Sequence, residues 1–324
     1  EVQLIEGVEP DPSVETVMRG AKVMQEFQPD WIVAMGGGSP IDAAKAMWAF
    51  YEYPEIKFED LITPFGFPEL RQKARFAAIP STSGTATEVT AFSVITDYST
   101  GIKYPLADFN ITPDVAIVDP DLVMGLPVKQ VAYTGMDALT HAIEGYITKG
   151  AWALSDMFHI KAIEIIAKSL RGAVKNTAEG REGMALGQYI AGMGFSNVGL
   201  GVDHSMAHTL SAYYDMPHGK ACAVLLPTVM AYNAPCTGEK YRDIAKAMGV
   251  EGTEKMTQEE YRKAAVDAVR QLSEDVGIQS TLKGVVKEED LKALSESAFA
   301  DACRPGNPRD TSVEEIEALY RSLM

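Results

Sequence analysis

A short apolar run that leads directly into three glycines is the feature that most constrains the fold. Residues 31–35 suit a buried strand, glycines follow at 36–38, and a helical pattern covers 41–49. Strands separated by helices predict a parallel, doubly wound sheet, which is a Rossmann-like domain. The other members of this alternation are a helical pattern over 14–27 and apolar runs at 76–80 and 115–118.

The glycine segment allows two interpretations. A glycine backbone can approach a phosphate without a clash at Cβ, and Ser39 and Pro40 are suitable residues for the start of a helix. The free N–H groups of that helix start would attract an anion. The alternative is a tight turn that needs glycine for its backbone angles, because the spacing is not the GxGxxG of dinucleotide-binding domains.

A second polar turn follows the apolar run at 76–80. Residues 81–85 read Ser-Thr-Ser-Gly-Thr, and we expect a helix to begin beside them. Ligands of open α/β sheets bind at the carboxyl ends of the strands, so these hydroxyls could contact a dinucleotide. Simple capping of the expected helix is the alternative.

The pattern changes after about residue 126, where nearly all segments have the period of helices. We therefore predict an α/β domain over 1–125 and a mostly helical domain over 126–324. The helices expected in the second domain cover 131–146, 154–175, 181–194, 204–213 and 258–276.

Composition excludes several functions. The chain has 29 Lys and Arg against 45 Asp and Glu, and its net charge of −16 repels nucleic acids and anionic membranes. No apolar run reaches the about 18 residues that span a bilayer, and the stretch at 221–232 is interrupted by Pro227. Three widely separated cysteines predict isolated, buried thiols in a reducing, cytoplasmic compartment.

All five histidines fall within one stretch of the predicted helical domain. Asp137 and His141 are four positions apart, as are His204 and His208, so each pair shares a helix face. His218 follows in a Pro-His-Gly turn. Converging helices could therefore bring a carboxylate and several imidazoles to one divalent cation.

Carboxylate and imidazole ligands suit Fe, Zn, Mn, Co or Ni, and the lack of a cysteine partner disfavours a structural zinc site. Spacing alone cannot choose between His204 and His208 as a ligand, and Asp137 could simply pair locally. His159 has no acidic residue at a ligand spacing, so we expect a structural or surface histidine there.

Several short segments carry a resemblance to one family. They are Gly-Gly-Gly-Ser-Pro-x-Asp at 36–42, the Ser/Thr turn at 80–85 with Glu88, and the segments 135–146, 204–208 and 217–219. With them the chain resembles the iron-containing (group III) alcohol dehydrogenases over nearly its whole length. Within that family, the segments 150–156, 184–197 and 306–309 are most similar to the lactaldehyde reductase (propanediol oxidoreductase) subgroup.

The resemblance implies a dehydroquinate synthase-like architecture, with a nucleotide-binding domain followed by a helical metal-binding domain that faces the cofactor cleft. The implied metal, usually ferrous iron with zinc as the alternative, has as ligands Asp137, His141, His204 and His218. His208 is implied to lie near the nicotinamide and the substrate and to relay a proton. The cofactor, NAD or NADP, is implied to contact Gly36, Gly37, Gly38, Ser39, Asp42, Ser81, Thr82, Thr85, Thr90 and Lys103.

The implied activity is reversible hydride transfer between a nicotinamide cofactor and a small aldehyde or primary alcohol, with lactaldehyde and 1,2-propanediol as the expected pair. The alternatives are a butanol or 1,3-propanediol type of dehydrogenase, or the alcohol dehydrogenase part of a bifunctional enzyme. A metal-dependent lyase is less favoured. The segments around the expected metal ligands contain only one basic residue, Lys220, that could hold an anionic substrate. A non-catalytic metal-binding protein is the remaining alternative.

Three features differ from the family pattern. Ser81 and Ser83 stand where relatives often have Thr and Ala, and Asp203 precedes His204 where an apolar residue is usual. The family's first strand and the acidic residue that contacts the ribose 2′-hydroxyl belong to an N-terminal segment that we expect to be missing before Glu1, so the sequence does not distinguish NAD from NADP. The resemblance also implies a homodimer.

Overall fold

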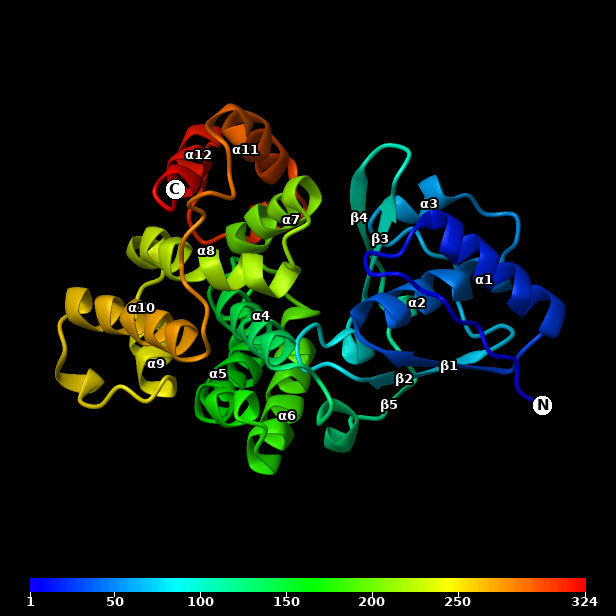
Figure 1. Cartoon of the computed structure of the whole chain (residues 1–324), viewed down its shortest axis with the longest axis horizontal. Helices are drawn as coiled ribbons and strands as arrows, with labels where there is room; N and C mark the ends of the chain where they lie inside the picture. Colours follow the sequence, from blue (N-terminus) through cyan, green and yellow to red (C-terminus); the bar gives the residue numbers. More distant parts are fainter. The chain divides into compact units, whose positions relative to one another are not determined.

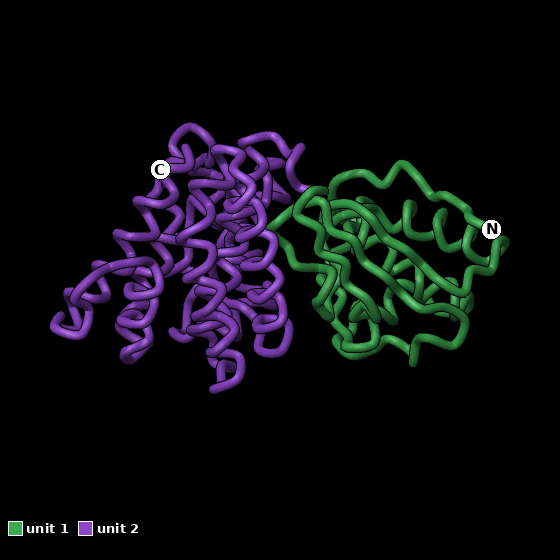
Figure 2. Tube along the Cα trace, turned by 90° about the horizontal axis from the view of Figure 1, so that it is seen from below, with its two compact units in different colours: residues 1–122 green, residues 123–324 purple.

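The computed structural model describes residues 1–324 and divides into two compact units, Glu1–Leu122 and Val123–Met324 (Figure 2). Each unit has an apolar core of its own, which includes Trp48 and Phe76 in the first and Leu139 and Leu225 in the second. The boundary expected from the sequence, after residue 125, lies three residues further along the chain than this division.

The first unit is built on a parallel sheet in the order β1-β2-β5 (Figure 1). Strand β1 (Trp31–Gly36) pairs with β2 (Arg75–Pro80) so that Gly36 lies opposite Pro80, and β2 pairs with β5 (Val115–Ala116). The helices are α1 (Val14–Phe27), α2 (Gly38–Glu52) and the short α3 (Phe58–Ile62). The predicted parallel α/β arrangement is confirmed, although the third strand pairs over only two of its four expected residues.

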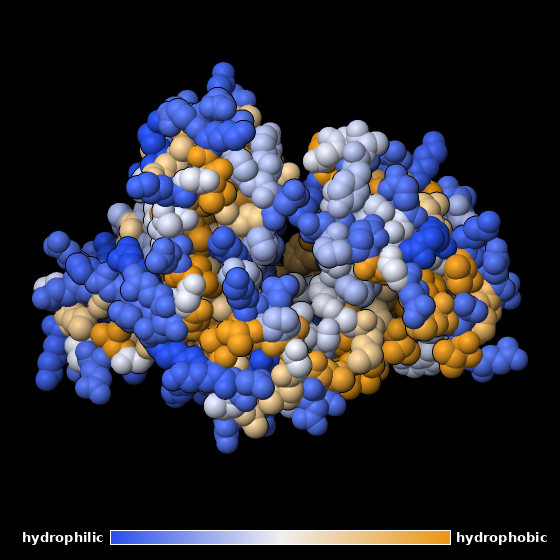
Figure 3. Space-filling model, viewed as in Figure 1, coloured by the Kyte–Doolittle hydropathy of each residue, from blue (hydrophilic) through white to orange (hydrophobic).

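Strand β1 lies at an edge of this sheet and buries one of its faces. Ile32 and Ala34 are buried, whereas Trp31, Val33 and Met35 are between 47% and 61% exposed. Figure 3 shows apolar side chains at the surface where Figure 1 places this strand. The strand therefore contributes only alternate side chains to the core of the unit.

The helix expected after residues 81–85 is absent, and that prediction is wrong. Ala86 adopts a left-handed conformation with a φ of 53°, and only a 3₁₀ turn, Thr87–Val89, follows it. The chain then enters an antiparallel hairpin that the sequence reading missed, formed by β3 (Phe92–Asp97) and β4 (Ile102–Ala107). The buried ammonium of Lys45 fixes this turn, because it donates to Thr87 Oγ1 at 3.0 Å and to the Phe92 carbonyl at 2.8 Å.

The second unit is helical, as predicted, and strands are absent from it. Its first helices are α4 (Val128–Ile147), α5 (Ala153–Val174), α6 (Ala178–Phe195), α7 (Val202–Tyr214) and α8 (His218–Asn233). They are followed by α9 (Lys240–Ala247), α10 (Gln258–Asp275), α11 (Leu291–Ala300) and α12 (Val313–Arg321). Helix α8 runs through Pro227, so the apolar stretch around that proline is one buried helix. None of the helices combines the length and apolar character that crossing a membrane requires.

His159 on α5 lies in the core of this unit. Its ring occupies space left by two glycines, since a Cβ on Gly145 or Gly194 would lie 2.3 or 2.4 Å from His159 Nε2. Neither ring nitrogen of His159 has a hydrogen-bond partner. Burial, together with the charge of Lys240, lowers the pKa of His159 to about 3.

This shift makes stability depend on pH. The imidazole of the unfolded chain takes up a proton near pH 6.5 whereas the buried ring does not, so the free energy of unfolding should fall as the pH drops below that value. We expect His159→Leu to flatten this dependence by up to about 1.4 kcal/mol per pH unit between roughly pH 4 and 6. Urea unfolding at several pH values measures how the free energy of unfolding changes with pH in the wild type and in the variant. Equal slopes in the two proteins would contradict the lowered pKa of His159.

Candidate metal centre and cofactor cradle

Three helices of the second unit bring the predicted metal-binding side chains together. Helix α4 carries Asp137 and His141, α7 carries His204, and α8 begins with His218. The distances from Asp137 Oδ1 are 3.8 Å to His204 Nε2, 3.5 Å to His218 Nε2 and 3.9 Å to His141 Nδ1. Donor atoms that share one tetrahedral ion lie about 3.4 Å apart, so these spacings suit a single cation.

Two of these atoms are buried without a hydrogen-bond partner. They are Asp137 Oδ1 and His204 Nε2, and both residues are at most 2% exposed. Burial raises the pKa of Asp137 to about 7 and lowers the pKa of His204 to about 3. Buried polar atoms usually have partners, and a cation between them would satisfy both lone pairs. The residues present therefore fit a divalent metal ion.

Glu144, one turn beyond His141 on α4, orients His204. Its carboxylate lies 2.7 Å from His204 Nδ1 and accepts from the backbone N–H of Asp203 at 2.7 Å. A hydrogen on Nδ1 leaves the lone pair of His204 on Nε2, which faces Asp137. Burial raises the pKa of Glu144 to about 7, and the backbone N–H groups oppose that shift.

Sequence reasoning did not select Glu144 as a site residue. Its three-residue spacing from His141 on the same helix was the available signal.

Gly219 allows α8 to begin close against α4. A Cβ at this position would lie 2.3 Å from the Tyr133 carbonyl oxygen and 3.2 Å from Asp137 Cβ. Only glycine permits that approach. The Pro-His-Gly turn thus places His218 beside Asp137.

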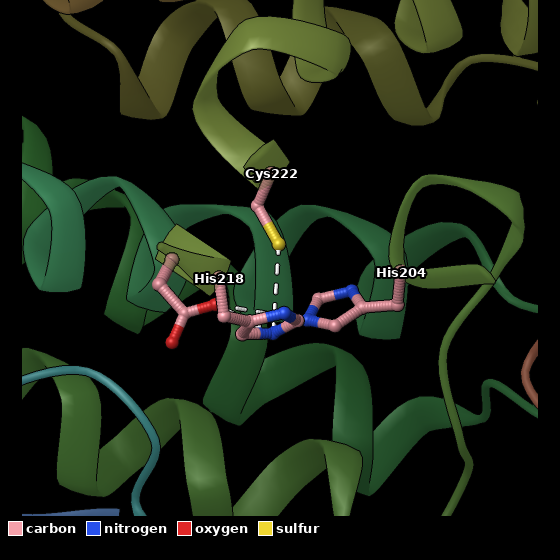
Figure 4. A group of neighbouring side chains, drawn as sticks. His204, His218 and Cys222 are labelled. Carbon is pink, nitrogen blue, oxygen red and sulfur yellow. Dashed lines mark hydrogen bonds and ion pairs between the residues drawn. The ribbon is translucent and has the colours of Figure 1, made fainter. Parts of the chain in front are cut away.

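His141 and Cys222 both lie near the donor atoms of Asp137, His204 and His218. The ring of His141 stacks on Phe195 with centroids 4.3 Å apart. The donor atoms of Asp137, His204, His218 and Cys222 all lie within 4.8 Å of one another, and Figure 4 shows the labelled histidines and the cysteine pointing toward one another.

The sequence reading assigned no cysteine to the site, although His218 and Cys222 have the same four-residue spacing as Asp137 and His141. Burial raises the pKa of the Cys222 thiol well above its ordinary value. The expectation of buried thiols is wrong for Cys236, which is exposed.

His208, one turn after His204, has a different partner. Its Nδ1 lies 2.9 Å from Asp301 Oδ2, and its ring stacks against that of His218 with centroids 5.3 Å apart. Burial alone would raise the pKa of Asp301, but the charge and hydrogen bond of His208 hold it well below its usual range. His208 thus lies beside the group of donor atoms and is anchored by a carboxylate.

In the first unit, the two polar turns at the carboxyl ends of β1 and β2 lie against each other. The Ser81 N–H donates to the Gly36 carbonyl at 2.7 Å. A Cβ on Gly37 would lie 3.3 Å from Thr82 Cγ2, and one on Gly38 would lie 3.0 Å from Thr85 Cγ2. Helix α2 begins at Gly38, and its N-terminal N–H groups can receive an anion. This cradle of small residues fits the pyrophosphate of a dinucleotide.

Asp42 and Thr90 make contacts within the protein. The partly buried Asp42 carboxylate accepts from Thr87 Oγ1 and from the Val94 N–H at 3.0 Å. The carbonyl of Thr90 accepts from Lys45 Nζ at 2.7 Å. Both residues therefore support the hairpin beside the cradle.

Ser39 and Lys103 both contact Asp11. Ser39 Oγ accepts from the Asp11 N–H at 3.3 Å, and Lys103 Nζ lies 2.8 Å from the Asp11 carboxylate. These contacts tie the segment before α1 to the start of α2 and to β4.

The comparison with known proteins assigns the family. The model of iron-containing alcohol dehydrogenases matches residues 1–120, and the model of the C-terminal part of the Fe-containing alcohol dehydrogenase family matches residues 131–324. The chain belongs to the iron-containing alcohol dehydrogenase family. The predicted family, and with it the prediction of an oxidoreductase, is confirmed.

Individual relatives cover almost all of the chain. It is 53% identical to the NADPH-dependent butanol dehydrogenase of Clostridium saccharobutylicum, over 100% of this chain and 84% of that protein. It is 51% identical to the lactaldehyde reductase of Escherichia coli (strain K12), over 98% of this chain and 83% of that protein. The crystal structure of a 1,3-propanediol oxidoreductase superposes with a TM-score of 0.96 at 39% identity, over 100% of this chain and 85% of that one.

Removing the acceptor at Glu144 should weaken metal binding. Glu144→Leu leaves His204 Nδ1 without its partner, and we expect the dissociation constant for Fe²⁺ or Zn²⁺ to rise by about 10- to 100-fold. Glu144→Gln keeps an acceptor oxygen and is the matched control, with a smaller rise. Titration with a competing chelator measures both constants. Wild-type affinity in a folded Glu144→Leu protein would show that Glu144 does not orient the ligand.

A side chain at Gly38 should disturb the cradle. In Gly38→Ala the added Cβ would lie 3.0 Å from the Thr85 methyl group, which must move by a few tenths of an ångström, and it would fill space beside the expected pyrophosphate. We therefore expect the dissociation constant for the dinucleotide to rise roughly tenfold. Fluorescence titration with NADH measures it, and metal content serves as the control because the metal centre lies in the other unit. An unchanged nucleotide affinity would place the cofactor elsewhere.

Proposed function

We propose that this chain catalyses reversible hydride transfer between a nicotinamide cofactor and a short-chain aldehyde or primary alcohol. One observation carries the proposal. Three helices bring Asp137 Oδ1, His204 Nε2 and His218 Nε2 close enough together to bind a single cation. Family membership supports the reaction class.

The proposed metal is ferrous iron, with zinc as the alternative, held by Asp137, His204 and His218 together with His141. When bound, such an ion acts as a Lewis acid toward the substrate oxygen. Asp137 supplies the compensating negative charge, and Glu144 holds His204 in the tautomer that exposes Nε2. The stacked ring of Phe195 shields His141 from water.

His208 is proposed to carry the proton. Its contact with Asp301 fixes the ring and stabilises the protonated imidazole, as a carboxylate partner does in general. In aldehyde reduction His208 can donate a proton toward the product oxygen, and in alcohol oxidation it can accept that proton.

The nicotinamide cofactor supplies and receives the hydride. We propose that Gly36, Gly37 and Gly38 and the start of α2 bind its pyrophosphate, with the hydroxyls of Ser81, Thr82 and Thr85 beside it. NAD is the proposed form, and NADP is the alternative because one relative is named NADPH-dependent.

The proposed substrate pair is lactaldehyde and 1,2-propanediol, and butanal with butanol is the alternative. Identities of 51% and 53% to relatives named for each activity support a short-chain substrate of either kind. We also propose a cytoplasmic homodimer that binds neither nucleic acid nor membrane. The three free cysteines and the net charge of −16 support the compartment and the absence of anionic partners.

The proposal separates the ligands from the proton carrier. In protein loaded anaerobically with Fe²⁺, His204→Ala and His218→Ala should lose both bound metal and turnover. His208→Ala should keep the metal and lose about 10²- to 10⁴-fold in kcat. Metal analysis and the loss of NADH absorbance with lactaldehyde, and in parallel with butanal, measure these outcomes.

Loss of metal in His208→Ala equal to that in His204→Ala would refute the division of roles. Faster turnover of butanal than of lactaldehyde would select the alternative substrate. No NADH oxidation by the metal-loaded protein with either aldehyde would favour a non-catalytic metal-binding protein.

A further inference from the structure

The Gly-Asn-Pro-Arg segment at 306–309 has no role in the reaction described above, although its asparagine is buried beside the metal-binding helices. Asn307 is 1% exposed. Its Oδ1 accepts from the Val202 N–H at 3.3 Å and from Asn233 Nδ2 at 2.9 Å. Its Nδ2 donates to Asn233 Oδ1 at 2.8 Å and to the Arg309 carbonyl at 2.7 Å. The amide therefore uses both of its donor hydrogens and both lone pairs of its oxygen.

Helix α7 begins without a capping side chain of its own, because its N-cap residue is Gly201. Its first N–H groups are received by residues that are distant in the sequence. The Val202 N–H donates to Asn307 Oδ1, and the next two N–H groups donate to the carboxylate of Glu144 at 2.7 and 3.3 Å. These two side chains together hold the first turn of α7, which contains the proposed ligand His204.

Two glycines allow these acceptors to lie close to the start of α7. A Cβ on Gly201 would lie 2.7 Å from Glu144 Oε1 and 3.0 Å from Asn307 Oδ1. A Cβ on Gly306 would lie 2.4 Å from the Leu200 carbonyl oxygen. A side chain at either glycine would therefore separate the segment 306–309 from the residues that begin α7.

We propose that Asn307 is a positioning residue of the metal centre, which holds the start of α7 so that His204 Nε2 faces Asp137. The hydrogen bonds of Asn307 go to α7, to its own segment and to Asn233, the last residue of α8. One amide thus joins the helix of His204 to the helix that begins with His218. The inference rests on the metal centre of the proposed function and adds a residue that sets its geometry.

Loss of the acceptor at Asn307 would act on the metal through the helix. The Val202 N–H is part of a fully buried residue and would be left without its partner, which is unfavourable. Glu144 alone would then hold the first turn of α7 while it also contacts His204 Nδ1. Because a shift of this turn moves a ligand, metal affinity should fall by more than the general loss of stability explains.

Two alanine variants test the proposal by a signal that does not depend on turnover. Asn307→Ala removes the acceptor of α7, whereas Asn233→Ala breaks the same pair of amides and leaves that acceptor in place. We expect the dissociation constant for Co²⁺, measured with a competing chelator, to rise roughly tenfold in Asn307→Ala and by no more than about threefold in Asn233→Ala. The visible absorption bands of bound cobalt, which report ligand geometry, should shift in Asn307→Ala only.

Two further variants complete the test. Asn307→Asp keeps an oxygen for the Val202 N–H, so its affinity for Co²⁺ should stay close to that of Asn233→Ala. Asn307→Ser has a hydroxyl too short to reach that N–H, and it takes the place of Asn307→Ala if the alanine variant does not fold. Urea unfolding of the metal-free proteins should show a loss of stability in both alanine variants.

The outcomes separate this inference from the proposed function. Equal cobalt affinities and identical cobalt spectra in folded Asn307→Ala and Asn233→Ala would overturn the positioning role and leave the metal centre intact. A loss of affinity in Asn307→Asp equal to that in Asn307→Ala would also overturn it. A wild-type protein that binds neither cobalt nor iron would overturn the proposed metal centre and this inference with it.

Discussion

A buried carboxylate that faces imidazole nitrogens is the interaction on which the second unit depends. Asp137 is 2% exposed and its Oδ1 has no hydrogen-bond partner. Ionising such a group without a counter-charge costs several kcal/mol, so this part of the core requires either a proton or a cation. The helices α4, α7 and α8 are arranged around that requirement, with apolar side chains such as Leu139 and Val224 filling the space beside it.

The neighbouring residues make the arrangement specific. Glu144 fixes the orientation of His204, and Gly219 lets α8 begin against α4 so that His218 reaches Asp137. Asp301 anchors His208 in a separate contact, which divides two histidines one turn apart into different environments. Chemistry at the centre is therefore set by partners of the donor atoms as much as by the donors themselves.

Much of this could be predicted from the sequence where the signal is periodic. The helix over 14–27 has the bounds of α1, and the four-residue spacing of Asp137 and His141, and of His204 and His208, correctly predicts that each pair shares one helix face. Contacts between helices could not be predicted that way, since Glu144 and Cys222 gain their meaning only when α7 and α8 meet α4. The hairpin of β3 and β4 could not be predicted because the chain enters it through a left-handed Ala86 and a hydrogen bond from the buried Lys45 to the Phe92 carbonyl, neither of which leaves a periodic pattern.

Anomalous diffraction from crystals of the iron-loaded protein, measured at the iron absorption edge, tests the central claim most directly. The account predicts one strong peak within bonding distance of Asp137 Oδ1, His204 Nε2 and His218 Nε2. A peak at His208, Asp301 and Cys303 with none at Asp137, or no ordered peak in fully loaded protein, would contradict it.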